Sequence, residues 1–214
     1  MTELRSLGDC RLYVSQIIDS LNDLAHVFEA DTETMVNYAQ RHFKSLHRQW
    51  EWLTVRAMLR FVSGNQTKIS YTAEGQPVLD NSELSISISH SKTHAAILLS
   101  ESTHIGVDIE QVGPRILKLQ NRIASANELP RGFEHTDCRQ QATYLTALWT
   151  AKEAVYKEGY SSEKFDMLSD VEMAPFSIGS LPLTLQVADK RYNYVSNIFI
   201  QEFCGNIIAV AKRL

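Results

Sequence analysis

Ile105-Gly106-Val107-Asp108-Ile109-Glu110 and, some forty residues later, Leu148-Trp149-Thr150-Ala151-Lys152-Glu153-Ala154-Val155-Tyr156-Lys157 are the stretches around which this sequence is organised. In the first stretch apolar and acidic residues alternate, which is the two-residue period of a β-strand. Asp108 and Glu110 are therefore predicted on one face of a strand, with apolar residues on the other face. The first stretch thus predicts two carboxylates that point the same way.

The second stretch has the period of an α-helix. Trp149, Glu153 and Lys157 follow one another at intervals of four residues, so a helix places a ring, a carboxylate and an ammonium along one stripe. A third acid is then available to meet Asp108 and Glu110. Converging carboxylates repel one another unless a cation lies among them, and oxygen ligands suit magnesium, which also binds phosphate oxygens. These residues predict a magnesium site that handles phosphates.

Each feature also has an ordinary structural explanation. An Asp-x-Glu at a strand end is commonly solvated, and Glu153 with Lys157 is the spacing of a weak surface ion pair. Trp149 alone would be a core residue. The joint occurrence of these residues in one spacing pattern favours a site, because surface charges have no physical reason to produce it.

The composition is that of an ordinary globular chain. It has 214 residues, of which 44% are hydrophobic and 21% charged, enough for one large core or two modest ones. No run approaches the roughly 18 apolar residues of a membrane helix, and the charged N-terminus lacks the apolar core of a signal peptide. We therefore expect a cytoplasmic protein with no membrane partner. The net charge of -4 argues against a nucleic-acid partner.

The three cysteines, Cys10, Cys138 and Cys204, have no C-x-x-C spacing. Neither a disulfide framework nor a zinc site is indicated. We expect reduced, mostly buried thiols.

Helices are expected over residues 19–31, from Asp31 to about Ser63 with interruptions, from Pro114 to Ala124, and over 136–159. The second region is basic, with Glu51 as the one acid between Arg41 and Arg60. Its charged edge is either a solvated face or a surface that meets phosphate.

Strands are expected over residues 12–18, 68–72, 85–89, 95–99, 105–110, 183–187, 192–203 and 207–211. The three strands between residues 85 and 110 are close in sequence and are expected to form one small antiparallel sheet. The hairpin of the last two strands is a faint echo of the hairpin at residues 85–99, which by itself is a weak sign of duplication.

The two organising stretches resemble the signature of a known family. Gly106-Val107-Asp108-Ile109-Glu110, a gap of about forty residues, and Trp149-Thr150-x-Lys152-Glu153-Ala154-x-x-Lys157 are similar to the signature of the 4'-phosphopantetheinyl transferases. The length is that of the larger, surfactin-synthetase-activating type. Matches to the family run from about Arg48 to Lys157.

The resemblance implies an α+β fold of two similar halves in a pseudo-twofold arrangement, with the active site in the cleft between them. Residues 1–104 would form the half that contacts the coenzyme nucleotide, and residues 105–214 the half with the metal ligands and the catalytic helix. Because the second half supplies what smaller relatives obtain from a neighbouring subunit, a monomer is implied.

The resemblance also implies a reaction. The 4'-phosphopantetheine arm of coenzyme A is transferred to a serine of an apo acyl or peptidyl carrier protein, with Mg²⁺, and 3',5'-adenosine bisphosphate is released. Asp108, Glu110 and Glu153 match the metal-ligand positions. Glu153 also matches the base, acting directly or through a metal-bound water, and Lys157 matches the catalytic lysine that stabilises phosphate charge.

Weaker matches concern the coenzyme. Ser89 and His90 resemble the family's Ser-His loop at the 3'-phosphate, and Arg48 resembles an arginine that binds the same phosphate through its guanidinium fork. Lys152 occupies a further motif position, and Asp108 and Lys157 also face the coenzyme phosphates. The resemblance places Glu128 near the metal. Gly75-Gln76-Pro77 aligns with a Gly-Lys-Pro turn, so Gln76 replaces a positive charge.

Two rival functions remain open from the sequence. A non-catalytic module that binds coenzyme A or a carrier protein has no need for three acids and a lysine. A metal-dependent nuclease usually has its lysine two residues after an acid on a strand, whereas here it lies four residues on along a helix. The net charge of -4 also weighs against a nuclease.

Overall fold

The computed structural model describes residues 1–64, 67–159, 166, 168–190 and 194–214, and it is built on two antiparallel β-sheets. The four-stranded sheet has the order β1-β2-β6-β5, and the five-stranded sheet has the order β7-β11-β10-β9-β8. The strands of the first sheet are β1 (Thr2–Leu4), β2 (Arg11–Gln16), β5 (Ser85–His90) and β6 (His94–Ser100). Those of the second are β7 (Ile105–Gln111), β8 (Val171–Glu172), β9 (Leu183–Asp189), β10 (Tyr194–Phe203) and β11 (Asn206–Arg213). The short strands β3 (Ile69–Tyr71) and β4 (Pro77–Leu79) pair with each other.

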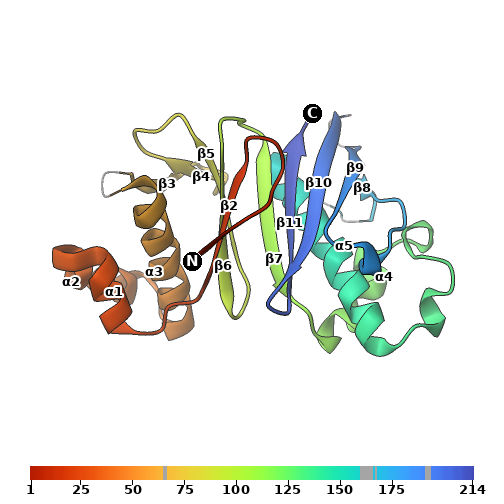
Figure 1. Ribbon diagram of the computed structural model, residues 1–214, viewed down its shortest axis with the longest axis horizontal. Coiled ribbons are helices and arrows are strands. Elements are labelled where there is room, and N and C mark those ends of the chain that lie inside the picture. The colour runs from red at the N-terminus through yellow and green to blue at the C-terminus, as the bar shows by residue number, and fades with distance from the viewer. Residues whose placement is uncertain (65–66, 160–165, 167, 191–193) are drawn as a thin grey trace.

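The helices are α1 (Leu21–Phe28), α2 (Thr32–His42), α3 (Leu46–Ser63), α4 (Gln120–Ile123) and α5 (Cys138–Gly159). The molecule is layered: helices α1 to α3 lie on one side, the two sheets lie in the middle, and α5 lies on the other side (Figure 1). Val55, Met58 and Leu59 of α3 pack on β5 and β6. The inner faces of the two sheets meet through residues such as Leu98 and Val107. Helix α5 packs on the outer face of the five-stranded sheet. The predicted α+β class is confirmed.

The predicted sheet of three strands between residues 85 and 110 is wrong. β5 and β6 pair as a hairpin, but β7 pairs with β11 in the other sheet. β7 nevertheless lies against β5, where the Ser87 hydroxyl accepts a hydrogen bond from the Val107 amide at 3.0 Å. The chain thus crosses from one sheet to the other between β6 and β7, and β7 lies at the junction.

Two predicted helical regions are divided in the structure, the first of them with the interruption that the sequence predicted. The region from residue 31 to 63 is split into α2 and α3 by extended backbone at Phe43 and Ser45. The region from Pro114 to Ala124 is a 3₁₀ helix over Pro114–Leu119 followed by the four-residue α4. The expected helix over 136–159 is confirmed as α5, with Asp137 accepting a hydrogen bond from the Gln140 amide at its start.

The sequence also predicted mostly buried thiols and no membrane-spanning helix. All three cysteines are free, but only Cys10 is buried while Cys138 and Cys204 are exposed, so the expectation of mostly buried thiols is wrong. Within the described ranges, no helix has the length and apolar character needed to cross a bilayer.

Gly106 sets how closely α5 approaches β7. A Cβ atom at this position would lie 1.9 Å from the Ala154 carbonyl oxygen and 2.7 Å from the Glu158 amide nitrogen, both backbone atoms of α5. Only glycine permits this contact, because a methyl group needs about twice that distance. Gly106 therefore sets the distance between β7, which carries Asp108 two residues further on, and α5, which carries Glu153 and Lys157.

Replacing Gly106 by Ala should lower the free energy of unfolding by about 1–3 kcal/mol, since overpacking forces backbone to shift. Urea unfolding followed by circular dichroism measures the change. Gly113→Ala is the matched control, because nothing lies within 4 Å of a Cβ there and its backbone is extended. Equal stability of the Gly106→Ala and Gly113→Ala proteins would show that the contact with α5 is not close.

Candidate functional site

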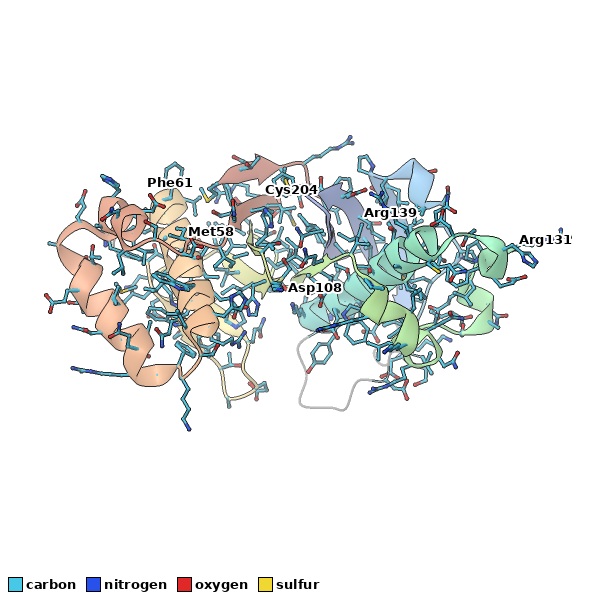
Figure 2. The ribbon with its side chains drawn as sticks, turned by 90° about the horizontal axis from the view of Figure 1, so that it is seen from below. Met58, Phe61, Asp108, Arg131, Arg139 and Cys204 are labelled. Carbon is cyan, nitrogen blue, oxygen red and sulfur yellow. The ribbon has the colours of Figure 1, made fainter. Side chains whose placement is uncertain are left out.

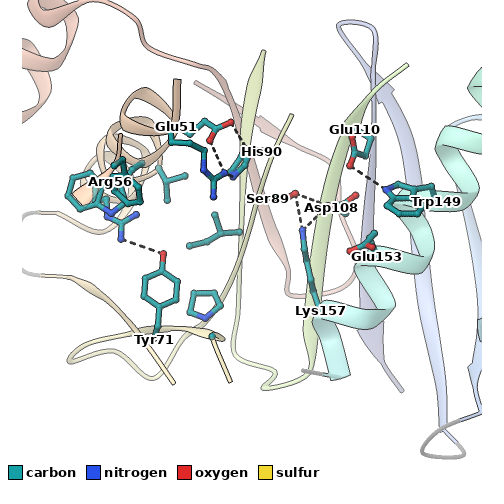
Figure 3. A pocket seen from close by; sticks show the side chains of 17 residues that line it. Glu51, Arg56, Tyr71, Ser89, His90, Asp108, Glu110, Trp149, Glu153 and Lys157 are labelled. Atoms are coloured by element: carbon teal, nitrogen blue, oxygen red, sulfur yellow. Dashed lines mark hydrogen bonds and ion pairs between the residues drawn. The ribbon is translucent and has the colours of Figure 1, made fainter. Parts of the chain in front are cut away.

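A pocket of about 530 Å³ lies between the parts of the chain before and after β7 (Figure 3). One wall comes from α3, the end of β5 and the turn between β3 and β4. The other wall comes from β7 and α5. Figure 2 shows Asp108 near the middle of the molecule, between the helices at its two ends. The main polar residues that line the pocket are Arg48, Glu51, Arg56, Ser89, His90, Asp108, Glu110, Glu153 and Lys157.

Three carboxylates line the second wall. Asp108 and Glu110 are on the face of β7 that the alternation predicted, and Glu153 reaches the same pocket from α5. Burial first and the charge of Asp108 second raise the pKa of Glu110 to about 7 and that of Glu153 to about 6. The indole of Trp149 donates a hydrogen bond to Glu110 at 3.3 Å. The three acids are therefore close enough to repel one another.

Lys157 lies at the centre of a hydrogen-bonded group. Its ammonium donates to Asp108 Oδ1 at 2.7 Å and to Ser89 Oγ at 2.9 Å, and Ser89 Oγ donates to Asp108 Oδ1 at 2.7 Å. Asp108 is 4% exposed. Its other oxygen, Oδ2, is buried and finds no hydrogen-bond partner among the described residues.

Asp108, Glu110 and Glu153 are suitable ligand types for a metal ion, but their side chains do not have the arrangement of a formed metal site. In the part of the chain that the structure describes, no group of three or more His, Cys, Asp or Glu side chains is arranged to hold a metal ion. The donor set still suits a hard divalent cation, because a buried Asp108 oxygen lacks a partner and two neighbouring acids have raised pKa values. Magnesium at Asp108, Glu110 and Glu153 stays a prediction.

Basic groups meet at the opposite wall. Arg48 Nη1 donates to Glu51 at 2.9 Å and to His90 Nε2 at 2.7 Å, and His90 Nδ1 lies 3.1 Å from Glu51. The structure thus brings together Arg48 and His90, which the sequence predicted to share a ligand with Ser89, whereas the Ser89 hydroxyl is bonded to Asp108 and Lys157 of the other wall. Glu51 was not predicted as a site residue. Its spacing from Arg48 (i,i+3) and His47 (i,i+4) on a helix was the signal that could have identified it.

An aromatic and cationic surface completes this wall. The guanidinium of Arg56 lies 4.1 Å from the centroid of the Trp52 ring and donates to the Tyr71 hydroxyl at 3.5 Å. Trp52 stacks in turn on Tyr38, with 4.9 Å between ring centroids. A planar ligand ring has a platform here. Trp52, Arg56 and Tyr71 were not predicted as site residues, because β3 and α3 are brought together only by the fold.

The Gly75-Gln76-Pro77 turn reaches the pocket through its outer residues. Gly75 and Pro77 line it, whereas Gln76 does not. The turn is closed by hydrogen bonds between the Thr72 and Gln76 backbones at 2.9 Å and from the Gly75 amide to Thr72 at 3.0 Å. Gly75 has φ of +88°, a left-handed conformation that favours glycine.

Lys152 lies elsewhere. Its side chain is fully buried and forms a salt bridge of 2.8 Å with Glu128, which is also fully buried. Glu128 further accepts hydrogen bonds from the Ser125 and Met173 amides, each at 2.9 Å. Lys152 and Glu128, predicted near the coenzyme and the metal, therefore do not line the pocket but tie α5 to the segments around it.

Comparison with known proteins finds one matching family model and several relatives. Residues 104–205 match the model of the 4'-phosphopantetheinyl transferase superfamily. The chain is 33% identical over 115 residues to the 4'-phosphopantetheinyl transferase AcpT of Escherichia coli O157:H7, a match that covers 52% of this chain and 58% of that protein. It is 30% identical over 117 residues to AcpT of Salmonella typhimurium, covering 52% and 59%. A putative 4'-phosphopantetheinyl transferase of Synechocystis is 28% identical over 140 residues, covering 58% and 56%. The matches thus span somewhat more than half the length of these relatives.

Proposed function

We propose, from the premise that residues 104–205 carry a domain of the 4'-phosphopantetheinyl transferase superfamily, that this chain transfers the 4'-phosphopantetheine arm of coenzyme A. The acceptor is a serine of an apo acyl or peptidyl carrier protein, and the second product is 3',5'-adenosine bisphosphate. One observation carries the proposal: Asp108, Glu110, Glu153 and Lys157 line a single pocket, opposite a wall that holds Arg48 and His90.

The proposed chemistry assigns separate tasks to two residues of α5, Lys157 and Glu153. Lys157, with its ammonium directed into the pocket from α5, stabilises negative charge on the reacting phosphate. Glu153, one turn earlier on the same helix, accepts the proton of the carrier serine, directly or through water. Its pKa of about 6 suits a base that works near neutral pH, because a base must be ionised yet able to hold a proton.

Magnesium would be held by Asp108, Glu110 and Glu153 and would neutralise charge on the pyrophosphate of coenzyme A. Coenzyme A would lie with its 3'-phosphate at Arg48, Ser89 and His90. Its adenine would lie near the surface formed by Trp52, Arg56 and Tyr71, since an aromatic base stacks well on an indole and a guanidinium.

The proposal includes an architecture of two similar halves, residues 1–104 and 105–214, related by a pseudo-twofold axis with the active site in the cleft between them. Each half has a sheet covered on its outer face by helix, α3 in one and α5 in the other. Residues from both halves line the same pocket, which is consistent with a working monomer.

The proposed function is tested by incubating the purified chain with coenzyme A, magnesium chloride and a set of apo acyl and peptidyl carrier proteins. The expected result is a mass gain of one phosphopantetheine arm on at least one carrier. Coenzyme A binding without mass gain on any carrier would favour a non-catalytic binding module. Cleavage of DNA in place of carrier modification would favour the nuclease.

Replacing Gln76 by Lys should restore a positive charge at the turn between β3 and β4. A lysine here is expected to lower the KM for coenzyme A about two- to fivefold, because a partly solvated charge pair contributes up to about 1 kcal/mol. Steady-state kinetics measure KM. Gln186→Lys, on an exposed position of β9, adds the same charge away from the pocket and should leave KM unchanged. An equal change in both variants would assign the effect to net charge alone.

A further inference from the structure

Glu51 is the shared partner of several basic side chains on one side of the pocket, and Figure 3 shows it next to His90. Its Oε2 accepts from Arg48 at 2.9 Å, and its Oε1 lies 3.1 Å from His90 Nδ1 and 3.0 Å from His47 Nε2. The residue is 6% exposed, although it lies on the first turns of α3 next to a pocket. An acid is thus built into the wall that otherwise offers cations to a ligand.

The hydrogen bonds fix the protonation of His90. Arg48 Nη1 can only donate, so His90 Nε2, 2.7 Å away, must accept and carries no proton. The other ring nitrogen, Nδ1, then carries the proton and donates to Glu51. Burial also lowers the pKa of His90, which agrees with a neutral ring. The group formed by Arg48, Glu51 and His90 therefore has one positive and one negative charge.

The single positive and single negative charge of this group determine which ligand groups can bind to Arg48 and His90. A phosphate monoester carries close to two negative charges at neutral pH and would share the Arg48 guanidinium with the Glu51 carboxylate. Two anions that share one cation repel each other, and solvent screens this repulsion only in part, because the Arg48 side chain is 55% exposed while that of Glu51 is 7% exposed. A neutral hydroxyl meets no such repulsion, because it can donate to the carboxylate and accept from the guanidinium.

We propose that Glu51 is a specificity residue that weakens selection for the 3'-phosphate, so that this chain accepts coenzyme A with or without that phosphate. The inference rests on the proposed function, which places the 3'-phosphate at Arg48 and His90. It goes further in naming a second substrate, dephospho-coenzyme A, and the side chain responsible for its use. Glu51→Gln keeps the shape and hydrogen bonding of the residue while removing the charge.

The direct test is calorimetric titration of the full chain with adenosine 3',5'-bisphosphate and with 5'-AMP, which differ only in the 3'-phosphate. We expect the wild type to prefer the bisphosphate by less than about tenfold. Glu51→Gln should bind the bisphosphate about tenfold more tightly and 5'-AMP within about twofold of the wild type. Asp31→Asn is the matched control, since it removes an acid from an exposed ion pair with Arg60 at the far end of α3.

The ratio of the affinities for the two nucleotides distinguishes an effect on specificity from an effect on stability. A residue that only stiffened the fold would change the affinity for both nucleotides alike, and such a result would overturn the inference. So would an unchanged or weakened affinity of Glu51→Gln for the bisphosphate. If that variant does not fold, the wild type still decides, because a preference for the bisphosphate above about tenfold contradicts the proposal.

Turnover separates this inference from the proposed function. Carrier modification with coenzyme A and with dephospho-coenzyme A should give wild-type kcat/KM values within about tenfold, and Glu51→Gln should widen the difference in favour of coenzyme A. Modification with coenzyme A alone would overturn the inference and support the proposed function. If neither nucleotide binds and neither coenzyme is used, the proposed function fails and the inference fails with it.

Discussion

Replacing Lys157 by Ala is expected to lower kcat for carrier modification by about 10²–10³-fold, the loss typical of removing one preorganised charge-stabilising donor. Lys157 is positioned by its hydrogen bonds to Asp108 and Ser89, one from each of the two sheets. Its ammonium is thus held in place before a substrate arrives. A positive charge held in this way acts most strongly on charge that develops in the transition state, so kcat should fall more than substrate affinity.

Mass-spectrometric rates at saturating coenzyme A and carrier measure this loss. Circular dichroism and thermal unfolding must show that the variant is folded, because Asp108 loses a partner. Lys190→Ala is the matched control, since it removes an ammonium paired with Glu172 on the surface and should keep the wild-type rate. A Lys157→Ala enzyme that retains its kcat within about threefold would remove Lys157 from the chemistry.

The second pocket wall was predictable from the sequence because its geometry is local. The alternation around Asp108 and the four-residue spacing from Trp149 to Lys157 each fix a direction within one strand or one helix. The structure confirms that these side chains line one pocket. Their catalytic and metal-binding roles are not settled by that placement and stay predictions.

The pairing of strands that are far apart in the chain could not be predicted from the sequence. β7 was expected in one sheet with β5 and β6, its neighbours in the chain, yet it pairs with β11, about a hundred residues later. Alternation specifies which face of a strand is buried but carries no information on its partner. Lys152 shows the same limit, because its motif position carries no information on its partner Glu128, which belongs to another segment of the chain.

Replacing Lys152 by Met is expected to lower the free energy of unfolding by about 3–5 kcal/mol, the range for breaking a buried ion pair by removing one partner. Both side chains are 0% exposed, so the Glu128 carboxylate would be left buried without its cation. The cost arises from that uncompensated charge rather than from lost volume, since Met and Lys are similar in size. Burial lowers the pKa of Lys152, because it disfavours the charged ammonium, and the hydrogen bond and negative charge of Glu128 oppose this shift.

Urea unfolding of a matched set separates charge from packing. Lys118→Met, on an exposed position of the 3₁₀ helix before α4, should be close to neutral. Adding Glu128→Gln to Lys152→Met should recover part of the loss, because the amide carries no charge. Recovery should be incomplete, because the Ser125 and Met173 amides donate to different oxygens of Glu128, Oε2 and Oε1, and a Gln side chain has only one oxygen. The backbone amide left unpaired costs about 1–3 kcal/mol. A double variant no more stable than Lys152→Met would show that the destabilisation comes from packing and not from the buried charge.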